Sequence, residues 1–147
     1  MSAGVKRCFD ARTEPCASLR AWLEIFCANS NTAKHTTWQL TLVLEELFVN
    51  TAKHGYADCA DAAATWPVWV ELSSSGASVH VIYEDAGVAF NPLENIQLPD
   101  YSGPPDTWRI GGLGLPMITG IARDLIYEHT AGHNRITLTV PAGETLA

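Results

Sequence analysis

A carboxylate and a carboxamide stand four residues apart in the sequence, at Glu46 and Asn50. In a helix this spacing places both side chains on one face, one turn apart. A carboxylate can take a proton from a substrate hydroxyl, and a carboxamide oxygen is a hard ligand of the kind that Mg²⁺ prefers. The alternative is a solvated pair of glutamates, Glu45 and Glu46, beside an asparagine near a helix end.

The residues around this pair predict the helix that positions it. Apolar residues and one threonine recur at intervals of three and four, which is the spacing of one helix face. They are Leu40, Val43, Leu44, Leu47 and Thr51. The candidate N-caps are Ser30, Asn31, Thr32, Thr36 and Thr37, and Gly55 is expected to end the helix. On a helical wheel, Glu46 and Asn50 lie at the edge of the apolar stripe, so we expect both to be half-buried at the rim of a cleft.

Two further segments at predicted element ends could bind a ligand. Asp85-x-Gly87 follows the predicted strand 78–84, although such a sequence is most often only a turn. The glycine-rich segment 111–114 precedes a predicted helix. Glycines let backbone N–H groups approach an anion, and a helix N-terminus adds about half a positive charge. The alternative for this segment is a tight loop in a packed corner.

The rest of the chain predicts an α+β fold. Alternating apolar and polar residues predict two hairpins, with turns at 74–76 and 131–134. Residues 91–111 are too rich in proline for a regular element and are long enough to form a lid. In order, the predicted elements are strand 5–11, helix 15–29, the helix carrying Glu46 and Asn50, strands 68–73 and 78–84, helix 117–124, and strands 125–130 and 135–140. This order predicts a single domain, 1–147, built as a two-layer α/β sandwich with helices on one face of a mixed, mostly antiparallel sheet.

Length, composition and charge exclude several classes of function. The 147 residues suffice for one domain with its own core, and no apolar run approaches the roughly 20 residues that span a bilayer. The formal net charge is −7 and basic residues do not cluster, so we expect no direct binding of nucleic acid. The N-terminus lacks an apolar signal region, which predicts a cytoplasmic location. His129 and His133 have a spacing that a metal could use, but a turn is the expected structure there.

Taken together, three motifs resemble those of the Bergerat-fold ATP-binding domains, the GHKL superfamily that includes gyrase-type, chaperone and histidine-kinase ATPases. The motifs are Glu-x-x-x-Asn on a helix, Asp-x-Gly-x-x-Phe after a strand, and Gly-x-Gly-Leu opening a helix after a variable lid. The resemblance covers residues 10–140. The sequences EELFVNTAKHGY, DAGVAFNP and GGLGLPMI look most like the stand-alone serine kinases of bacterial partner-switching systems, which act as anti-sigma factors.

The resemblance implies a role for each matching position. Asn50 matches the ligand of Mg²⁺, and Glu46 matches the general base that takes the proton of an acceptor serine or orients a water. Asp85 matches the carboxylate that accepts from the amino group of adenine, and Gly87 matches the glycine that lets the base approach. Gly112 and Gly114 match the glycines that hold the phosphates of ATP. The remaining positions implied to bind ATP are His54, Phe90, Arg109, Gly111, Leu113 and Leu115.

Two functions fit these implied roles. In the first, the chain is an ATP-dependent serine kinase that phosphorylates a STAS-domain antagonist, releases it and then holds a sigma factor, as a homodimer. The phosphate adds about −1.5 to −2 charges at the interface with an acidic kinase, which would eject the substrate. In the second, the chain binds ATP or ADP and sequesters a sigma factor or another regulator without significant catalysis. Glu46 favours the first function. Some family members have an arginine where this chain has Ile110, one place after Arg109, and this difference leaves the second function open.

Overall fold

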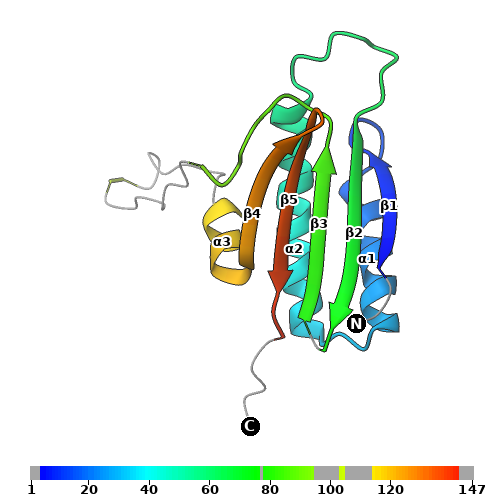
Figure 1. Cartoon of the computed structure of the whole chain (residues 1–147), viewed down its shortest axis with the longest axis vertical. Helices are drawn as coiled ribbons and strands as arrows, with labels where there is room; N and C mark the ends of the chain where they lie inside the picture. The colour runs from blue at the N-terminus through cyan, green and yellow to red at the C-terminus, as the bar shows by residue number, and fades with distance from the viewer. Residues whose placement is uncertain (1–3, 77, 95–102, 105–113, 143–147) are drawn as a thin grey trace.

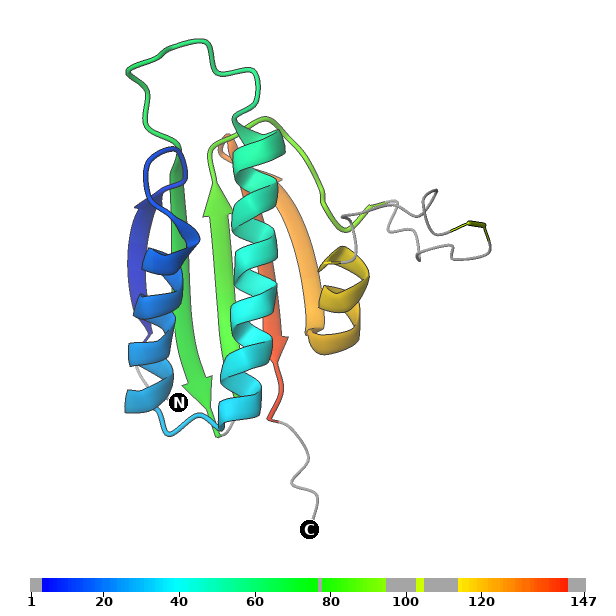
Figure 2. The same cartoon turned by 180° about the vertical axis from the view of Figure 1, so that it is seen from behind.

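The computed structural model describes residues 4–76, 78–94, 103–104 and 114–142. Within these ranges, one five-stranded sheet carries the helices on one face, and its other face is open (Figures 1 and 2). The predicted two-layer α+β sandwich is therefore confirmed. Each pairing in the described sheet is antiparallel, where the sequence analysis expected mostly antiparallel pairing.

The elements follow one another in the predicted order. They are β1 (Val5–Asp10), α1 (Cys16–Asn29), α2 (Lys34–Asn50), a π-helical turn η1 (Thr51–Gly55), β2 (Pro67–Ser75), β3 (Ser78–Asp85), α3 (Gly114–Ile121), β4 (Arg123–Thr130) and β5 (His133–Val140). The strand order in the sheet is β1-β2-β3-β5-β4, so β3 is its central strand.

The core lies between the helices and the inner face of the sheet. Alternate residues of β2, β3 and β5 are buried, as the two-residue period of a strand requires. Helix α2 runs along the middle of the sheet and contributes its apolar stripe to the core (Figure 2). The buried side chains of this stripe include Leu40, Val43, Leu44 and Leu47. Burial of each such side chain contributes about 1.5–3 kcal/mol.

Three segments that are distant in sequence meet at one end of the sheet, the upper end in Figure 1. Strand β3 ends there with Asp85, and β5 begins there at His133, with its second residue, Asn134, paired opposite Asp85. The C-terminal end of α2 reaches the same end of the molecule (Figure 2). The element ends therefore bring the polar residues of separate motifs to one place.

The start of α2 differs from the expectation, because none of the predicted residues forms a side-chain cap. The residue at the N-cap position is Ala33. Thr36 is buried within the first turn. The hydroxyl of Thr37 donates to the carbonyl of Ala33 at 3.1 Å. These threonines thus lie inside the helix and do not precede it.

Helix α3 lies earlier in the chain than the predicted helix 117–124. It ends at Ile121, and β4 begins at Arg123. Asp124 has φ of 55°, a left-handed conformation that cannot continue an α-helix. The pairing of β4 with β5 is irregular at this point, between Arg123 and Ile126.

The turn between β4 and β5 has the predicted form. Ala131 and Gly132 have φ of 52° and 78°, and His129 and His133 lie on the strands that flank them. Among the described residues, no group of three or more His, Cys, Asp or Glu side chains could hold a metal ion. In the same part of the chain, no helix is both long and apolar enough to cross a membrane.

Candidate functional site

The C-terminal half of α2 carries two of the predicted side chains. Glu46 and Asn50 are both half-buried, as their place at the edge of the apolar stripe predicts. The side-chain nitrogen of Asn50 is buried and has no hydrogen-bond partner among the described residues. A buried polar group without a partner costs about 1–3 kcal/mol. The carboxamide of Asn50 is therefore available to a ligand, through its nitrogen or, after a rotation of the amide, its oxygen.

After Asn50 the helix widens into the π-helical turn η1, a feature that often occurs at functional sites. The turn ends at Gly55, the predicted stop. The carbonyl of Gly55 accepts from the backbone N–H of Val88 at 2.9 Å. A Cβ atom at Gly87 would lie only 2.3 Å from the same carbonyl oxygen. Gly87 is thus required because the backbone of Gly55 packs against it.

Asp85 is the buried carboxylate of the site, with 6% of its surface exposed. Its Oδ1 accepts from the side-chain nitrogen of Asn134 at 2.8 Å and from the backbone N–H of Gly87 at 3.1 Å. Among the described residues, its Oδ2 accepts only from the hydroxyl of Thr51, at 2.8 Å. These three donors offset the lost hydration of the carboxylate. In the described part of the chain, no second group donates to Oδ2.

Tyr83 supports Asp85 from beneath the site. Its hydroxyl lies 2.6 Å from Oγ1 of Thr51. Burial raises the pKa of Tyr83 well above its ordinary value, so the hydroxyl keeps its proton. Thr51 has a single hydroxyl proton and donates it to Asp85, which leaves Tyr83 as the donor to Thr51. The chain of donors from Tyr83 through Thr51 fixes one oxygen of Asp85.

Asn134 holds Asp85 from the other side. Its Nδ2 donates to Oδ1 of Asp85 and to the carbonyl of Val88, both at 2.8 Å. Its Oδ1 accepts from the backbone N–H of Phe90 at 3.0 Å and from the hydroxyl of Tyr127. The sequence analysis placed Asn134 only in a turn. The register of β5 on β3 puts it opposite Asp85, and no local sequence signal could have found that contact.

A small cavity lies between these segments. Its volume is about 20 Å³, room for about one water molecule, and it opens to solvent. Asn50, Asp85, Phe90 and Asn134 are among the residues that line it. The ring of His54 packs on that of Phe90, with centroids 5.2 Å apart. A cavity of this volume is far smaller than the roughly 300–1,000 Å³ of small-molecule sites, so a nucleotide would fill mainly the open space beside it.

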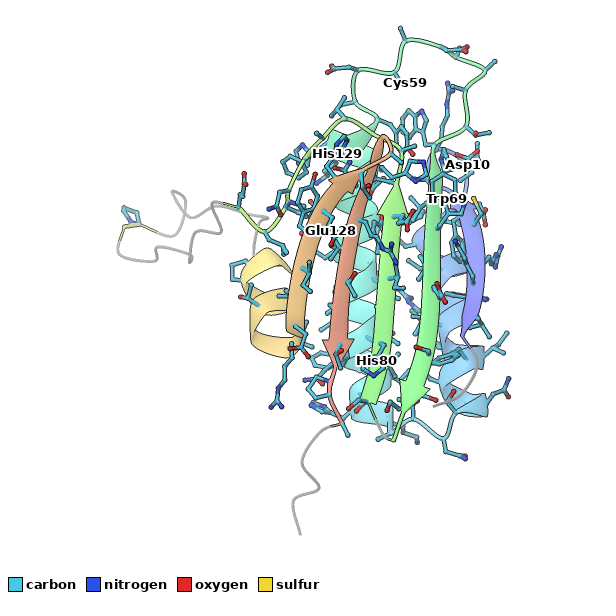
Figure 3. All side chains as sticks on the ribbon, in the orientation of Figure 1. Asp10, Cys59, Trp69, His80, Glu128 and His129 are labelled. Atoms are coloured by element: carbon cyan, nitrogen blue, oxygen red, sulfur yellow. The ribbon has the colours of Figure 1, made fainter. Side chains whose placement is uncertain are left out.

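Side chains on the open face of the sheet also connect β3 and β5 (Figure 3). Trp69, labelled in Figure 3, stacks on the ring of His133 with centroids 4.9 Å apart. Nδ1 of His133 lies 3.2 Å from a carboxylate oxygen of Glu84. Because neighbouring strand residues point to opposite faces, this pair lies behind Asn134 and Asp85. The pairing of β3 with β5 is therefore supported from both faces at the site.

The predicted site residues fall into three groups. The structure brings together Asn50, Asp85, Gly87 and Phe90, with His54 on Phe90. Glu46 lies one turn before Asn50 and does not line the cavity within the described part of the chain. Gly114 and Leu115 open helix α3, and their side chains are not described. Arg109, Gly111, Gly112 and Leu113 lie outside the described residues.

Comparison with known proteins identifies the family. Residues 9–140 match the model of the histidine kinase-like ATPase domain. The chain belongs to this family. The match contains every segment of the site, and membership implies that the ATPase domain binds ATP. The resemblance seen in the sequence motifs is thereby confirmed.

A solved structure shows the same fold as this ATPase domain. The crystal structure of the RsbU and RsbW domains of Rv1364c from Mycobacterium tuberculosis is similar, with a TM-score of 0.60 and 18% sequence identity. The similarity covers 96% of this chain but 34% of that chain, so the ATPase domain spans about a third of its length. A comparison with curated proteins gave no match.

The chemistry of Asn50 fits a magnesium ion that arrives with a nucleotide. The described residues offer the carboxamide of Asn50 but no cluster of three metal-binding side chains. Mg²⁺ commonly takes one or two protein ligands and completes its shell with phosphates and waters. Asn50 is thus suited to a metal that arrives with ATP. Oδ2 of Asp85 could accept from a base, since Thr51 is its one donor within the described ranges.

Proposed function

We propose that this ATPase domain is a serine protein kinase and anti-sigma factor of a bacterial partner-switching system, acting on a STAS-domain antagonist. One observation carries the proposal. A half-buried glutamate, Glu46, precedes by one helical turn an asparagine whose buried side-chain nitrogen has no partner among the residues that the structure describes. A proton acceptor beside a nucleotide site is what transfer to a hydroxyl needs. The fold shared with a chain that contains an RsbW domain supports the same function.

In the proposed complex, Asp85 recognises the base. Its Oδ1 already has two donors and its Oδ2 has one. The amino group of adenine would therefore donate to Oδ2. Phe90 lines the cavity and would lie against the base.

At the other end of the nucleotide, Asn50 would hold Mg²⁺ through its oxygen, and the ion would offset charge on the phosphates. Glu46 takes the proton of the acceptor serine while the serine oxygen bonds to the γ-phosphorus. The bond from that phosphorus to the bridging oxygen breaks, and ADP leaves. On sequence grounds alone, segment 91–111 is proposed as the ATP lid, and the residues from Gly111 to Leu115 as phosphate ligands.

Phosphorylation would act on the partner through charge. The ATPase domain has a net charge of −7, and phosphoserine adds about −1.5 to −2 charges at pH 7. The phosphorylated STAS protein would be repelled, which frees the kinase to hold a sigma factor. We propose that the kinase acts as a homodimer in the cytoplasm.

Phosphotransfer with a matched pair of variants tests this function. The wild type, Glu46→Gln and Glu45→Gln are incubated with magnesium, labelled ATP and a STAS-domain protein encoded beside the gene. Glu46→Gln should lose about 10²–10⁴-fold in transfer rate yet keep its affinity for ADP. Glu45→Gln should keep both, because Glu45 is bound to Arg20 on the helix surface. Equal transfer by wild type and Glu46→Gln removes Glu46 from the mechanism.

A catalytically weak module that binds ATP or ADP and sequesters a regulator is the second candidate. Ile110, which stands where some family members have an arginine, keeps this function open. This function predicts tight binding of nucleotide and of a sigma factor, with no labelled phosphate on the STAS protein.

A further inference from the structure

Asn134 has no hydrogen-bonding capacity left for a ligand. A carboxamide has two N–H donors and an oxygen with two lone pairs. The two donors of Asn134 go to Asp85 and Val88, and its oxygen accepts from Phe90 and Tyr127. The residue is only 5% exposed. Asn134 therefore acts on a ligand only through the groups that it holds.

Asn134 holds the two residues of the cavity that would contact a base, Asp85 and Phe90. On β3, Asn134 donates to Oδ1 of Asp85, while Oδ2 accepts from Thr51 and from no other described group. On the segment after β3, it binds the backbone of Val88 and Phe90, and the latter residue lines the cavity. One side chain thus sets both the direction of a carboxylate and the place of an aromatic ring.

We propose that Asn134 is the positioning residue of the adenine pocket, holding Asp85 so that one carboxylate oxygen faces the amino group of the base and holding Phe90 against the ring. The inference rests on the proposed nucleotide function, because it takes the base to be adenine. Asn134 lies on β5, which none of the three sequence motifs includes, and the pairing of β5 with β3 places it opposite Asp85.

The variant Asn134→Asp keeps the shape of the side chain but removes both N–H donors. It places a second carboxylate where Nδ2 now lies, 2.8 Å from Asp85. Two carboxylates at this distance share a proton on acidification, and the shared proton restores a hydrogen bond between them. The other titratable groups near position 134 are Tyr127 and His129 on β4, Tyr83 through Thr51, and Glu94, which acts on Tyr127. These groups are the same in the wild type and in Asn134→Asp. The ratio of the ADP affinities of the two proteins at each pH therefore reports on position 134 alone.

Calorimetry with ADP and magnesium, from about pH 8 down to about pH 6, tests the proposal. Near pH 8, Asn134→Asp should bind ADP about 10- to 100-fold more weakly than the wild type. Toward pH 6 this deficit should shrink several-fold. The matched control Asn31→Asp lies in an exposed loop and should bind ADP like the wild type at every pH.

Two results with Asn134→Asp would overturn the proposal. One is wild-type affinity in Asn134→Asp, and the other is a deficit that stays the same at every pH, since a packing role has no proton dependence. If Asn134→Asp does not fold, Tyr127→Phe removes only the hydroxyl that donates to Asn134, and it should weaken ADP binding about 2- to 5-fold. Unchanged binding by Tyr127→Phe also overturns the proposal. Failure of the wild type to bind ADP would instead reject the proposed function, and this inference with it.

Discussion

Replacing Gly87 with alanine tests how the segment after β3 is held. An ideal Cβ at Gly87 would lie 2.3 Å from the carbonyl oxygen of Gly55, 2.6 Å from its carbonyl carbon and 2.7 Å from its Cα. All three are backbone atoms, so no change of rotamer can relieve the overlap. Ordinary contacts lie at about 3.5–4.0 Å. One of the two backbone segments must therefore move by roughly 1 Å.

This movement has a cost that can be worked out from the contacts it disturbs. The hydrogen bond from Val88 to Gly55, 2.9 Å long, would stretch beyond its normal range and lose about 0.5–1.5 kcal/mol. Overpacking itself costs about 1–3 kcal/mol. Gly87→Ala should thus lower the free energy of unfolding by about 2–4 kcal/mol. The displacement also disturbs the bond from Gly87 to Asp85, so the affinity for ADP should fall at least about tenfold.

Urea denaturation measures the stability term, and calorimetry with ADP measures the binding term. Gly120→Ala is the matched control, because a Cβ at Gly120 would meet nothing within 4 Å. Within helix α3, alanine is preferred to glycine by about 0.5–1 kcal/mol, so this control should be as stable as the wild type or more stable. If Gly87→Ala unfolds with the wild type and binds ADP equally well, the packing of Gly87 on η1 is refuted.

Three further perturbations probe the same network. Asp85→Asn should weaken ADP binding at least about tenfold in calorimetry, while Asp58→Asn, on the exposed connector, should not; equal affinities would refute the adenine assignment. Tyr83→Phe removes the donor to Thr51 and should cost about 1 kcal/mol in urea denaturation; unchanged stability would contradict the proposed order of donors. Burial raises the pKa of Tyr56 to about 12 from its ordinary 10.0. Its neutral hydroxyl therefore contributes stability that is complete below pH 10 and lost as pH rises toward about 12. The free energy of unfolding should fall over this window, and less steeply in Tyr56→Phe.

The fold could be predicted because its signals are local. Strand alternation and helical spacing depend only on near neighbours, and they located the central helix and both hairpins. Boundaries were less predictable. The expected helix 117–124 ends at Ile121, and the last two residues of that prediction, Arg123 and Asp124, belong to β4. The threonines before α2 were expected to cap it, and the helix begins early enough to include Thr36 and Thr37.

The site could be predicted only as far as its motifs reach. Asn50 and Asp85 come together as expected, because each stands at the end of an element with a strong pattern. Thr51, Tyr83 and Asn134 read as core or turn residues in the sequence. Thr51 and Asn134 bind Asp85, and Tyr83 binds Thr51, because the end of α2 and the register of β5 on β3 bring them together. Such contacts between distant segments leave no local signature in the sequence.

A crystal structure with ADP and magnesium tests the central claim most directly. The amino group of adenine should lie within about 2.7–3.2 Å of Oδ2 of Asp85, and the oxygen of Asn50 at about 2.0–2.1 Å from the magnesium ion. A cavity still filled by the protein's own side chains, with ADP bound elsewhere and Asn50 facing away from it, would contradict the account.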